Sequence, residues 1–131
     1  MPVVGISGNS SDDSFAVARY NSDGSLDATF GVGGTKVMDL GFRVEIAYDV
    51  ERQADGKYIL GGSVGAINSH DWGLVRFLSN GDLDNSFDQD GIAVTAITGN
   101  EDALTDLVLQ PDGKILAAGS AGRFAGEFIL S

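Results

Sequence analysis

The stretch that decides the fold is Gln53-Ala54-Asp55-Gly56-Lys57, which recurs 57 residues later as Gln110-Pro111-Asp112-Gly113-Lys114. Other landmarks recur at the same offset without a gap: Arg19 with Arg76, Phe30 with Phe87, and Gly62-Ser63 with Gly119-Ser120. Such a period is typical of repeat proteins, whose units bury their apolar faces by stacking on one another. We therefore predict a single domain, 1–131, made of two repeats (12–68 and 69–125) with leftover strands at 2–8 and 127–130.

The composition indicates an all-β fold. The chain of 131 residues has 19 glycines and only two prolines, and its β-branched residues are scattered in short runs. No segment keeps a helical period, and each apolar run stops at a turn signal after about a strand's length. We therefore expect many short strands joined by tight turns.

Each repeat is predicted to contain four strands. The expected ranges are 15–20, 36–40, 47–52 and 57–63 in the first copy, and 72–78, 92–97, 104–109 and 114–118 in the second. Asp55-Gly56 predicts a type I′ hairpin turn, because both residue types tolerate positive φ. Stacked four-stranded antiparallel units are the blades of a β-propeller. A ten-stranded β-sandwich is the competing architecture, but it gives no reason for the regular repeat.

The repeated residues resemble those of the delta-60 family of bacterial repeats. The matching pieces are the run from Phe15 to Asp27 (FAVARYNSDGSLD), Gln53–Lys57, and in the second copy Asn80–Asp84 and Gln110–Lys114. The resemblance implies a β-propeller-like fold in a surface or secreted protein, and it implies neither a reaction nor catalytic residues. The second copy has Asp88 and Asp90 where the first has Gly31 and Gly33, so we expect its long turn to differ in shape.

Two repeats are too few for a ring, since propellers use about four to eight blades. We therefore expect a homo-oligomer whose chains complete a propeller together, with the leftover strands pairing across chain boundaries. We expect a first and a fourth strand not to be neighbours within an ordinary blade, which leaves the geometry of this exchange open.

The net charge of −11 argues against nucleic acid and anionic membranes as partners, because both repel an acidic surface. The chain has no cysteine, which excludes disulfides and thiolate metal sites. Residues 1–8 lack the basic start and the length of a signal peptide, so the extracellular location rests on the family resemblance alone.

One end of the predicted blades gathers candidate catalytic and metal-binding residues. Connections from fourth to first strands and from second to third strands should emerge at the same end. The candidates there are Asp12, Asp13, His70, Asp71 and Glu127. Imidazole and carboxylates could hold a divalent cation, calcium or zinc, and such a metal could activate water for ester or phosphoester hydrolysis. The alternative is that His70 is an ordinary solvated loop residue.

Two further sets of residues have a functional and a structural interpretation. The turn residues Asp23, Asp27, Asp82 and Asp84 could ligate calcium, or could shape their turns through local hydrogen bonds. Trp72 could line a sugar-binding groove or pack between blades. Arg19 and Arg76 recur within strands, and we expect each to pair with an acidic residue of its own repeat, with Asp49 and Asp106 as candidates.

Three functions therefore remain open after the sequence is read. The first is a non-enzymatic repeat module that serves as a structural or binding scaffold. The second is a hydrolase, metal-assisted or using an acid/base pair, at the acidic mouth of an oligomeric propeller. The third is a lectin-like protein that binds a glycan or another small molecule between its blades.

Overall fold

The computed structural model describes residues 2–9 and 12–122, and within these ranges it contains only strands, turns and loops. The strands are β1 (Pro2–Asn9), β2 (Asp12–Arg19), β3 (Thr35–Met38), β4 (Val44–Arg52), β5 (Tyr58–Ala66), β6 (Ser69–Phe77), β7 (Ile92–Thr95), β8 (Ala103–Leu109) and β9 (Ile115–Ser120). No helix in the described ranges is long and apolar enough to span a membrane. The predicted all-β fold is confirmed.

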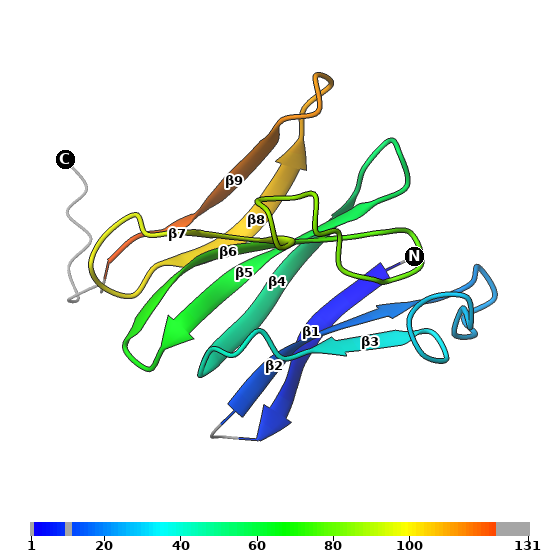
Figure 1. Cartoon of the computed structure of the whole chain (residues 1–131), viewed down its shortest axis with the longest axis horizontal. Coiled ribbons are helices and arrows are strands. Elements are labelled where there is room, and N and C mark those ends of the chain that lie inside the picture. Colours follow the sequence, from blue (N-terminus) through cyan, green and yellow to red (C-terminus); the bar gives the residue numbers. More distant parts are fainter. Residues whose placement is uncertain (1, 10–11, 123–131) are drawn as a thin grey trace.

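The strands form three antiparallel sheets that lie side by side (Figure 1). The first sheet is β1-β2-β3 (blue to cyan), the second is β4-β5-β6-β7 (green to yellow), and the third is β8-β9 (orange). Each predicted strand in the described residues is present within a few residues of its expected range. The predicted strand at 127–130 lies outside the described residues.

The sheets are offset from the sequence repeats. In the second sheet β5 pairs with β6 through a tight hairpin, with Ala66 opposite Ser69. The fourth strand of one repeat therefore lies beside the first strand of the next, and our expectation that these strands are not neighbours is wrong. A two-residue hairpin connection, residues 67 and 68, joins these strands, and strands joined so closely in sequence usually pair with each other.

The β4–β5 and β8–β9 turns differ from the predicted type I′ geometry. Gly56 and Gly113 have positive φ (87° and 86°), but Asp55 and Asp112 do not. Gly56 N donates to Gln53 O at 3.0 Å, and Gln53 N donates to Lys57 O at 2.7 Å. This is a type I turn followed by a left-handed glycine, the common three-residue alternative to type I′.

The long turns of the two repeats have different shapes, as predicted. Positive φ occurs at Gly31, Gly33 and Gly34 in the first copy. In the second copy it occurs at Asp88, Gln89 and Gly91. A side chain at Gly31 would overlap the Thr35 carbonyl, so Asp88 requires the altered path.

The core lies between the sheets rather than within any one of them. One cluster joins two residues of β2, Phe15 and Val17, and Phe30 of the following turn to the second sheet. The residues of the second sheet in this cluster include Leu60 and Val75. A second cluster joins Ile59 of β5 to the third sheet, with these two leucines at its centre: Leu104 and Leu107. Each sheet is therefore buried by its neighbours, as expected of stacked repeats.

Bulges and glycines allow the sheets to approach closely. The β4–β5 register shifts at Tyr48, and the β8–β9 register shifts at the matching residue Thr105. A methyl group at Gly62 would overlap the Ile46 carbonyl oxygen, and one at Gly61 would lie 2.6 Å from Leu104 of the third sheet. These glycines therefore permit close approach beside a bulge.

We expect Gly62→Ala to lower the free energy of unfolding by about 2–3 kcal/mol, because the methyl group cannot fit without moving the backbone of β4. Urea denaturation followed by circular dichroism measures the change. Gly99→Ala is the matched control, since nothing lies within 4 Å of the added methyl group. Equal unfolding midpoints for the two variants would contradict the packing argument.

Candidate functional site

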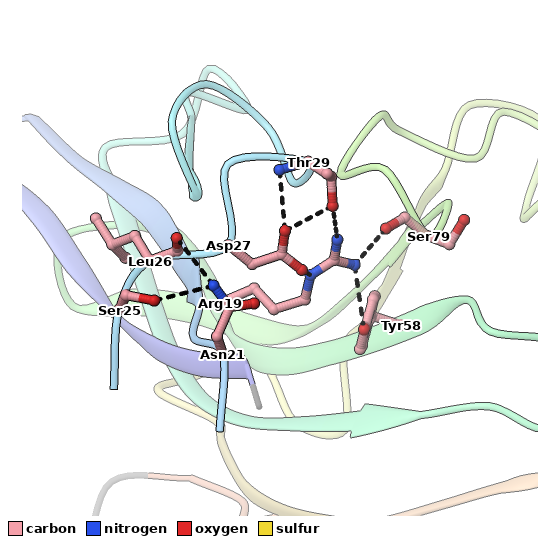
Figure 2. Close-up of polar contacts among 8 residues, drawn as sticks. All are labelled: Arg19, Asn21, Ser25, Leu26, Asp27, Thr29, Tyr58 and Ser79. Carbon is pink, nitrogen blue, oxygen red and sulfur yellow. Dashed lines mark hydrogen bonds and ion pairs between the residues drawn. The ribbon is translucent and has the colours of Figure 1, made fainter. Parts of the chain in front are cut away.

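Arg19 ties the first sheet to the second (Figure 2). At the end of β2, its Nε donates to Asp27 Oδ2 at 2.9 Å and its Nη2 donates to Thr29 Oγ1 at 2.9 Å. Its Nη1 donates to the backbone carbonyl of Ser79 at 2.6 Å, in the turn that follows β6. One guanidinium thus joins a turn of its own repeat to a turn of the next, a task suited to its rigid fork of donors.

Residues close to Arg19 in sequence position its hydrogen-bond partners. Asp27 Oδ1 accepts hydrogen bonds from Thr29 N at 3.0 Å and Thr29 Oγ1 at 2.6 Å. These bonds, together with Arg19, hold the pKa of Asp27 below its ordinary value. The ring of Phe30 lies under the guanidinium, 4.9 Å from its carbon. We call Arg19, Asp27, Thr29 and Phe30 the first clamp.

A turn of the second sheet docks on the first clamp. Besides the Ser79 contact, Gly31 N donates to Asn80 O at 2.8 Å. A methyl group at Gly81 would lie 3.2 Å from the Phe30 ring, so the backbone there touches the ring directly. Phe30 is fully buried by this contact. We call residues 78–81 the docking turn.

The second repeat builds the same clamp from Arg76, Asp84, Ser86 and Phe87. Arg76 Nε donates to Asp84 Oδ2 at 2.8 Å, Nη2 donates to Ser86 Oγ at 3.2 Å, and the Phe87 ring lies 4.7 Å from the guanidinium. Lys57 Nζ also lies 2.9 Å from Asp84 Oδ2. Hydrogen bonds from Ser86 and Lys57 lower the pKa of Asp84 far below its ordinary value.

The second clamp is open where the first is occupied. Among the described residues, no hydrogen bond involves Arg76 Nη1, whereas Arg19 Nη1 binds the docking turn. Phe87 is only partly buried, whereas Phe30 is fully buried. The two clamps are therefore chemically alike and differ in whether a neighbouring turn covers them.

Asp49 makes a second link between sheets. Its Oδ2 accepts a hydrogen bond from Leu107 N of β8 at 2.8 Å, and its Oδ1 accepts one from Val50 N at 2.8 Å. The bulge at Tyr48 turns this carboxylate toward the third sheet. The prediction that each arginine pairs with an acid of its own repeat is confirmed, but the partners are Asp27 and Asp84, and the choice of Asp49 and Asp106 was wrong.

The opposite end of the sheets has a buried carboxylate at one repeat position, Glu45 in the first copy and Asp102 in the second. Glu45 Oε1 accepts hydrogen bonds from Leu40 N at 2.8 Å and Phe42 N at 3.0 Å. Its Oε2 is buried without a hydrogen-bond partner in the described part of the chain. Burial raises the pKa of Glu45 above its ordinary value.

Asp102 accepts more hydrogen bonds than Glu45 does. It accepts hydrogen bonds from Thr98 N at 2.8 Å, Thr98 Oγ1 at 2.7 Å, Ile97 N at 2.9 Å and Gly122 N at 2.8 Å. The bonds from the Thr98 backbone lead in lowering the pKa of Asp102, which falls to about 2. Both carboxylates anchor the loop that enters the first strand of a sheet.

The candidate hydrolytic residues lie at this same end. His70 and Asp71 begin β6, and Asp13 lies in β2. The His70 carbonyl accepts a hydrogen bond from Asp102 N at 2.8 Å, which confirms that the two kinds of connection meet. His70 is part-buried, and its Nδ1 has no hydrogen-bond partner among the described residues.

The proposed metal ligands stay a prediction. Glu127 and the side chain of Asp12 lie outside what the structure describes. Among the side chains that it does describe, no three histidine or acidic groups come together in an arrangement that could hold a metal ion.

The turn aspartates make local contacts. Asp23 Oδ1 accepts hydrogen bonds from Ser25 N at 2.9 Å and Ser25 Oγ at 2.6 Å, and these lower the pKa of Asp23. Asp82 Oδ2 accepts a hydrogen bond from Asn80 Nδ2 at 2.9 Å. Asp27 and Asp84 belong to the clamps. These contacts match the structural interpretation, and calcium binding remains untested.

Trp72 lies between the second and third sheets. It is part-buried, packs against the cluster around Leu104, and donates from Nε1 to Ser120 O at 3.1 Å. The indole therefore contributes to packing between sheets. Its use in a sugar-binding groove remains a prediction.

Comparison with known protein families matches residues 3–30, 53–87 and 110–128 to the family described as "domain of unknown function (DUF5122) beta-propeller". The matched segments cover more than half of the chain and recur at the repeat spacing. The chain belongs to this family. No curated protein matches the sequence. The predicted β-propeller class is thereby confirmed, while the delta-60 assignment remains a resemblance.

Sequence reasoning missed the contact between Arg19 and the docking turn. Ser79 contributes only its backbone carbonyl, so no side-chain pattern could have indicated it.

We expect Arg19→Lys to destabilise the protein by about 2–3 kcal/mol and Arg76→Lys by about 1 kcal/mol, because a lysine keeps the charge but loses the fork of donors. Arg19 loses a contact between sheets, whereas Arg76 loses only contacts within its repeat. Chemical denaturation of both variants measures the difference. A larger effect at Arg76 would contradict the assignment of the first clamp as the occupied junction.

We expect Asp102→Asn to lower the stability at pH 7 and Glu45→Gln to leave it unchanged or raise it. The pKa of Asp102 is about 2 in the folded state and about 3.9 when unfolded, so its stabilisation is present above about pH 4 and is lost as the pH falls toward 2. The pKa of Glu45 is raised, so ionisation of Glu45 destabilises the fold as the pH rises.

Melting temperature measured from pH 2 to 7 tests this pair. Asp102→Asn should melt lower at pH 7 and lose less stability on acidification than the unaltered protein. Glu45→Gln should melt at the same temperature or higher at pH 7, since the amide oxygen can still accept the bonds from Leu40 and Phe42. A drop in both variants would show that Glu45 is bound as an anion.

Proposed function

We propose that this chain is a non-enzymatic repeat module that acts as a structural or binding scaffold of a bacterial surface or secreted protein. The observation that carries the proposal is the doubled clamp. The polar residues that recur between the repeats, Arg19 with Arg76 and Asp27 with Asp84, fasten turns and sheets to one another. These residues recur because each repeat must pack on the next, and their contacts are explained without a reaction centre.

A groove between the first and second sheets supports the binding part of the proposal. It is an open groove of about 430 Å³, and small-molecule sites span about 300–1,000 Å³. Its lining combines apolar residues, among them Leu83, with the charged residues Lys36 and Asp39. This combination suits a small polar ligand such as a glycan. We further propose that the module associates with copies of itself, because its sheets are buried only by neighbouring sheets.

The second candidate is the hydrolase. It is favoured by His70, next to Asp71 at the end of the sheets, whose Nδ1 has no hydrogen-bond partner in the part of the chain that the structure describes. A part-buried imidazole with a free ring nitrogen can act as a general base if a substrate reaches it.

An assay of ester and phosphoester hydrolysis separates the two. We expect no turnover above buffer for the unaltered protein, His70→Ala or Asp71→Ala, and a melting temperature indifferent to chelator. General base catalysis by His70 would instead give activity that falls about 10²–10⁴-fold in His70→Ala. Such a loss, with the fold intact by circular dichroism, would establish the hydrolase.

A further inference from the structure

We propose that a second copy of this chain completes the third sheet by strand exchange, with its β2 and β3 pairing on β9 and its turn at residues 21–24 docking on the open clamp. This proposal rests on the scaffold function and names the surfaces that it uses. Two observations carry it, one from strand register and one from the clamps.

The first observation is that β1 and β9 stand at the same repeat position, so β9 can pair with a β2 strand in the register that β1 uses. In the second sheet Gly62 of β5 lies opposite Gly73 of β6. In the first sheet Gly5 lies opposite Ala16, which is the same register shifted by one repeat of 57 residues. The residue of β9 at this repeat position is Gly119. The chain therefore contains three strands of one type, and β1 and β9 are alternative partners for a β2 strand.

The edges of the third sheet are consistent with this exchange. Its order is β8-β9, so in the described residues β9 pairs on one side only, whereas its counterpart β5 pairs on both sides. A β2–β3 hairpin from a second copy would restore the four-strand order seen in β4-β5-β6-β7. Its own β1 would be released, because β9 takes that edge.

The second observation is the pair of clamps. The docking turn on the first clamp follows β6, and its counterpart in the first repeat is residues 21–24, which follow β2 and are exposed. Nothing lies within 4 Å of a methyl group added at Gly24, whereas one at Gly81 would meet Gly31 N at 3.0 Å and the Phe30 ring. The same turn is thus covered inside the chain and uncovered at its edge.

A β2 strand placed on β9 by the repeat register brings this turn to the second clamp. Arg76 Nη1 would bind the Ser22 carbonyl of the incoming copy, as Arg19 Nη1 binds that of Ser79. The contacts use backbone carbonyls, so Asp23 in place of Asn80 does not break them, and its carboxylate is held by Ser25. One geometric step therefore fills both the edge of β9 that is unpaired within residues 2–9 and 12–122 and the position that the docking turn would take on the second clamp.

The assembly is head-to-tail. Each copy contributes one full sheet and shares another with its neighbour, so a closed ring has two sheets per copy. Because propellers use about four to eight blades, rings of about two to four copies are expected. Each copy carries a net charge of −11, so association should strengthen as salt is added.

Disulfide trapping tests the register. Because the chain has no native cysteine, only the introduced cysteines can form a disulfide. The register places Ala117 of one copy opposite Ala18 of the next, within reach of a disulfide in either kind of antiparallel pair. Mixing full-length Ala117→Cys with full-length Ala18→Cys under oxidation should give a linked dimer. In the control, Ala54→Cys, on an exposed turn, replaces Ala18→Cys. This pair should give at least about tenfold less linked dimer.

Sedimentation velocity tests the clamp. We expect Gly24→Asn to weaken association about tenfold or more, because its side chain would strike Phe87 of the neighbour. Gly41→Asn is the matched control, with a similar positive φ (83° against 88°) and nothing within 4 Å, and it should associate like the unaltered protein. Melting temperatures confirm that both variants fold.

A protein that stays monomeric at high concentration and raised salt, or an oligomer that neither links through Ala117 and Ala18 nor responds to Gly24→Asn, overturns the proposal. Either result leaves the hydrolysis assay unaffected, so failure of the exchange can be told apart from failure of the scaffold function.

Discussion

The constraint on which this structure depends is that each sheet is buried by the next sheet in the series. Ile59 is fully buried where the third sheet covers the second, whereas Leu116, at the same repeat position in the third sheet, is 56% exposed. A large aliphatic side chain at one repeat position is thus buried or exposed according to whether a neighbouring sheet covers it. Burying apolar area is the main source of stability in such a fold, so stacking is its organising force.

Close stacking explains features that would otherwise be costly. Gly61 and Gly62 lower the stability of an isolated strand, but Gly61 leaves room for the leucines of the third sheet and Gly62 leaves room for the backbone of β4. The bulge at Tyr48 interrupts the β4–β5 ladder, and it also directs Asp49 to the backbone of β8. The local cost of each feature is offset by contact between sheets.

The recurring polar residues serve the same packing. Arg19 is part-buried, and burial of a charge is unfavourable unless every donor finds a partner. Asp27, Thr29, the Phe30 ring and the Ser79 carbonyl supply those partners, and the last of them comes from the adjacent sheet. The family match describes a β-propeller of unknown function, and the doubled clamp gives its repeated residues a physical role.

The strands, their approximate ranges and the repeated unit could be predicted from the sequence, because alternating apolar residues and turn signals act over a few neighbouring positions. The partner of Arg19 was not predicted, because only the folded turn brings Asp27 onto the guanidinium, while Asp49 is held by the backbone amides of Val50 and Leu107. The type of the β4–β5 turn was also missed, because Asp-Gly is compatible with more than one hairpin geometry.

The sequence alone determined that the protein is an all-β repeat with four strands per 57 residues. Only the tertiary structure decided where one sheet ends and the next begins. A sequence repeat has no intrinsic starting point, so the sequence is compatible with any grouping of four consecutive strands into a sheet. Strand pairing through the short β5–β6 hairpin selects one of these groupings. The same holds for the clamps, which share an arginine, an aspartate and a phenylalanine in sequence, whereas among the described residues a neighbouring turn covers only the first of them.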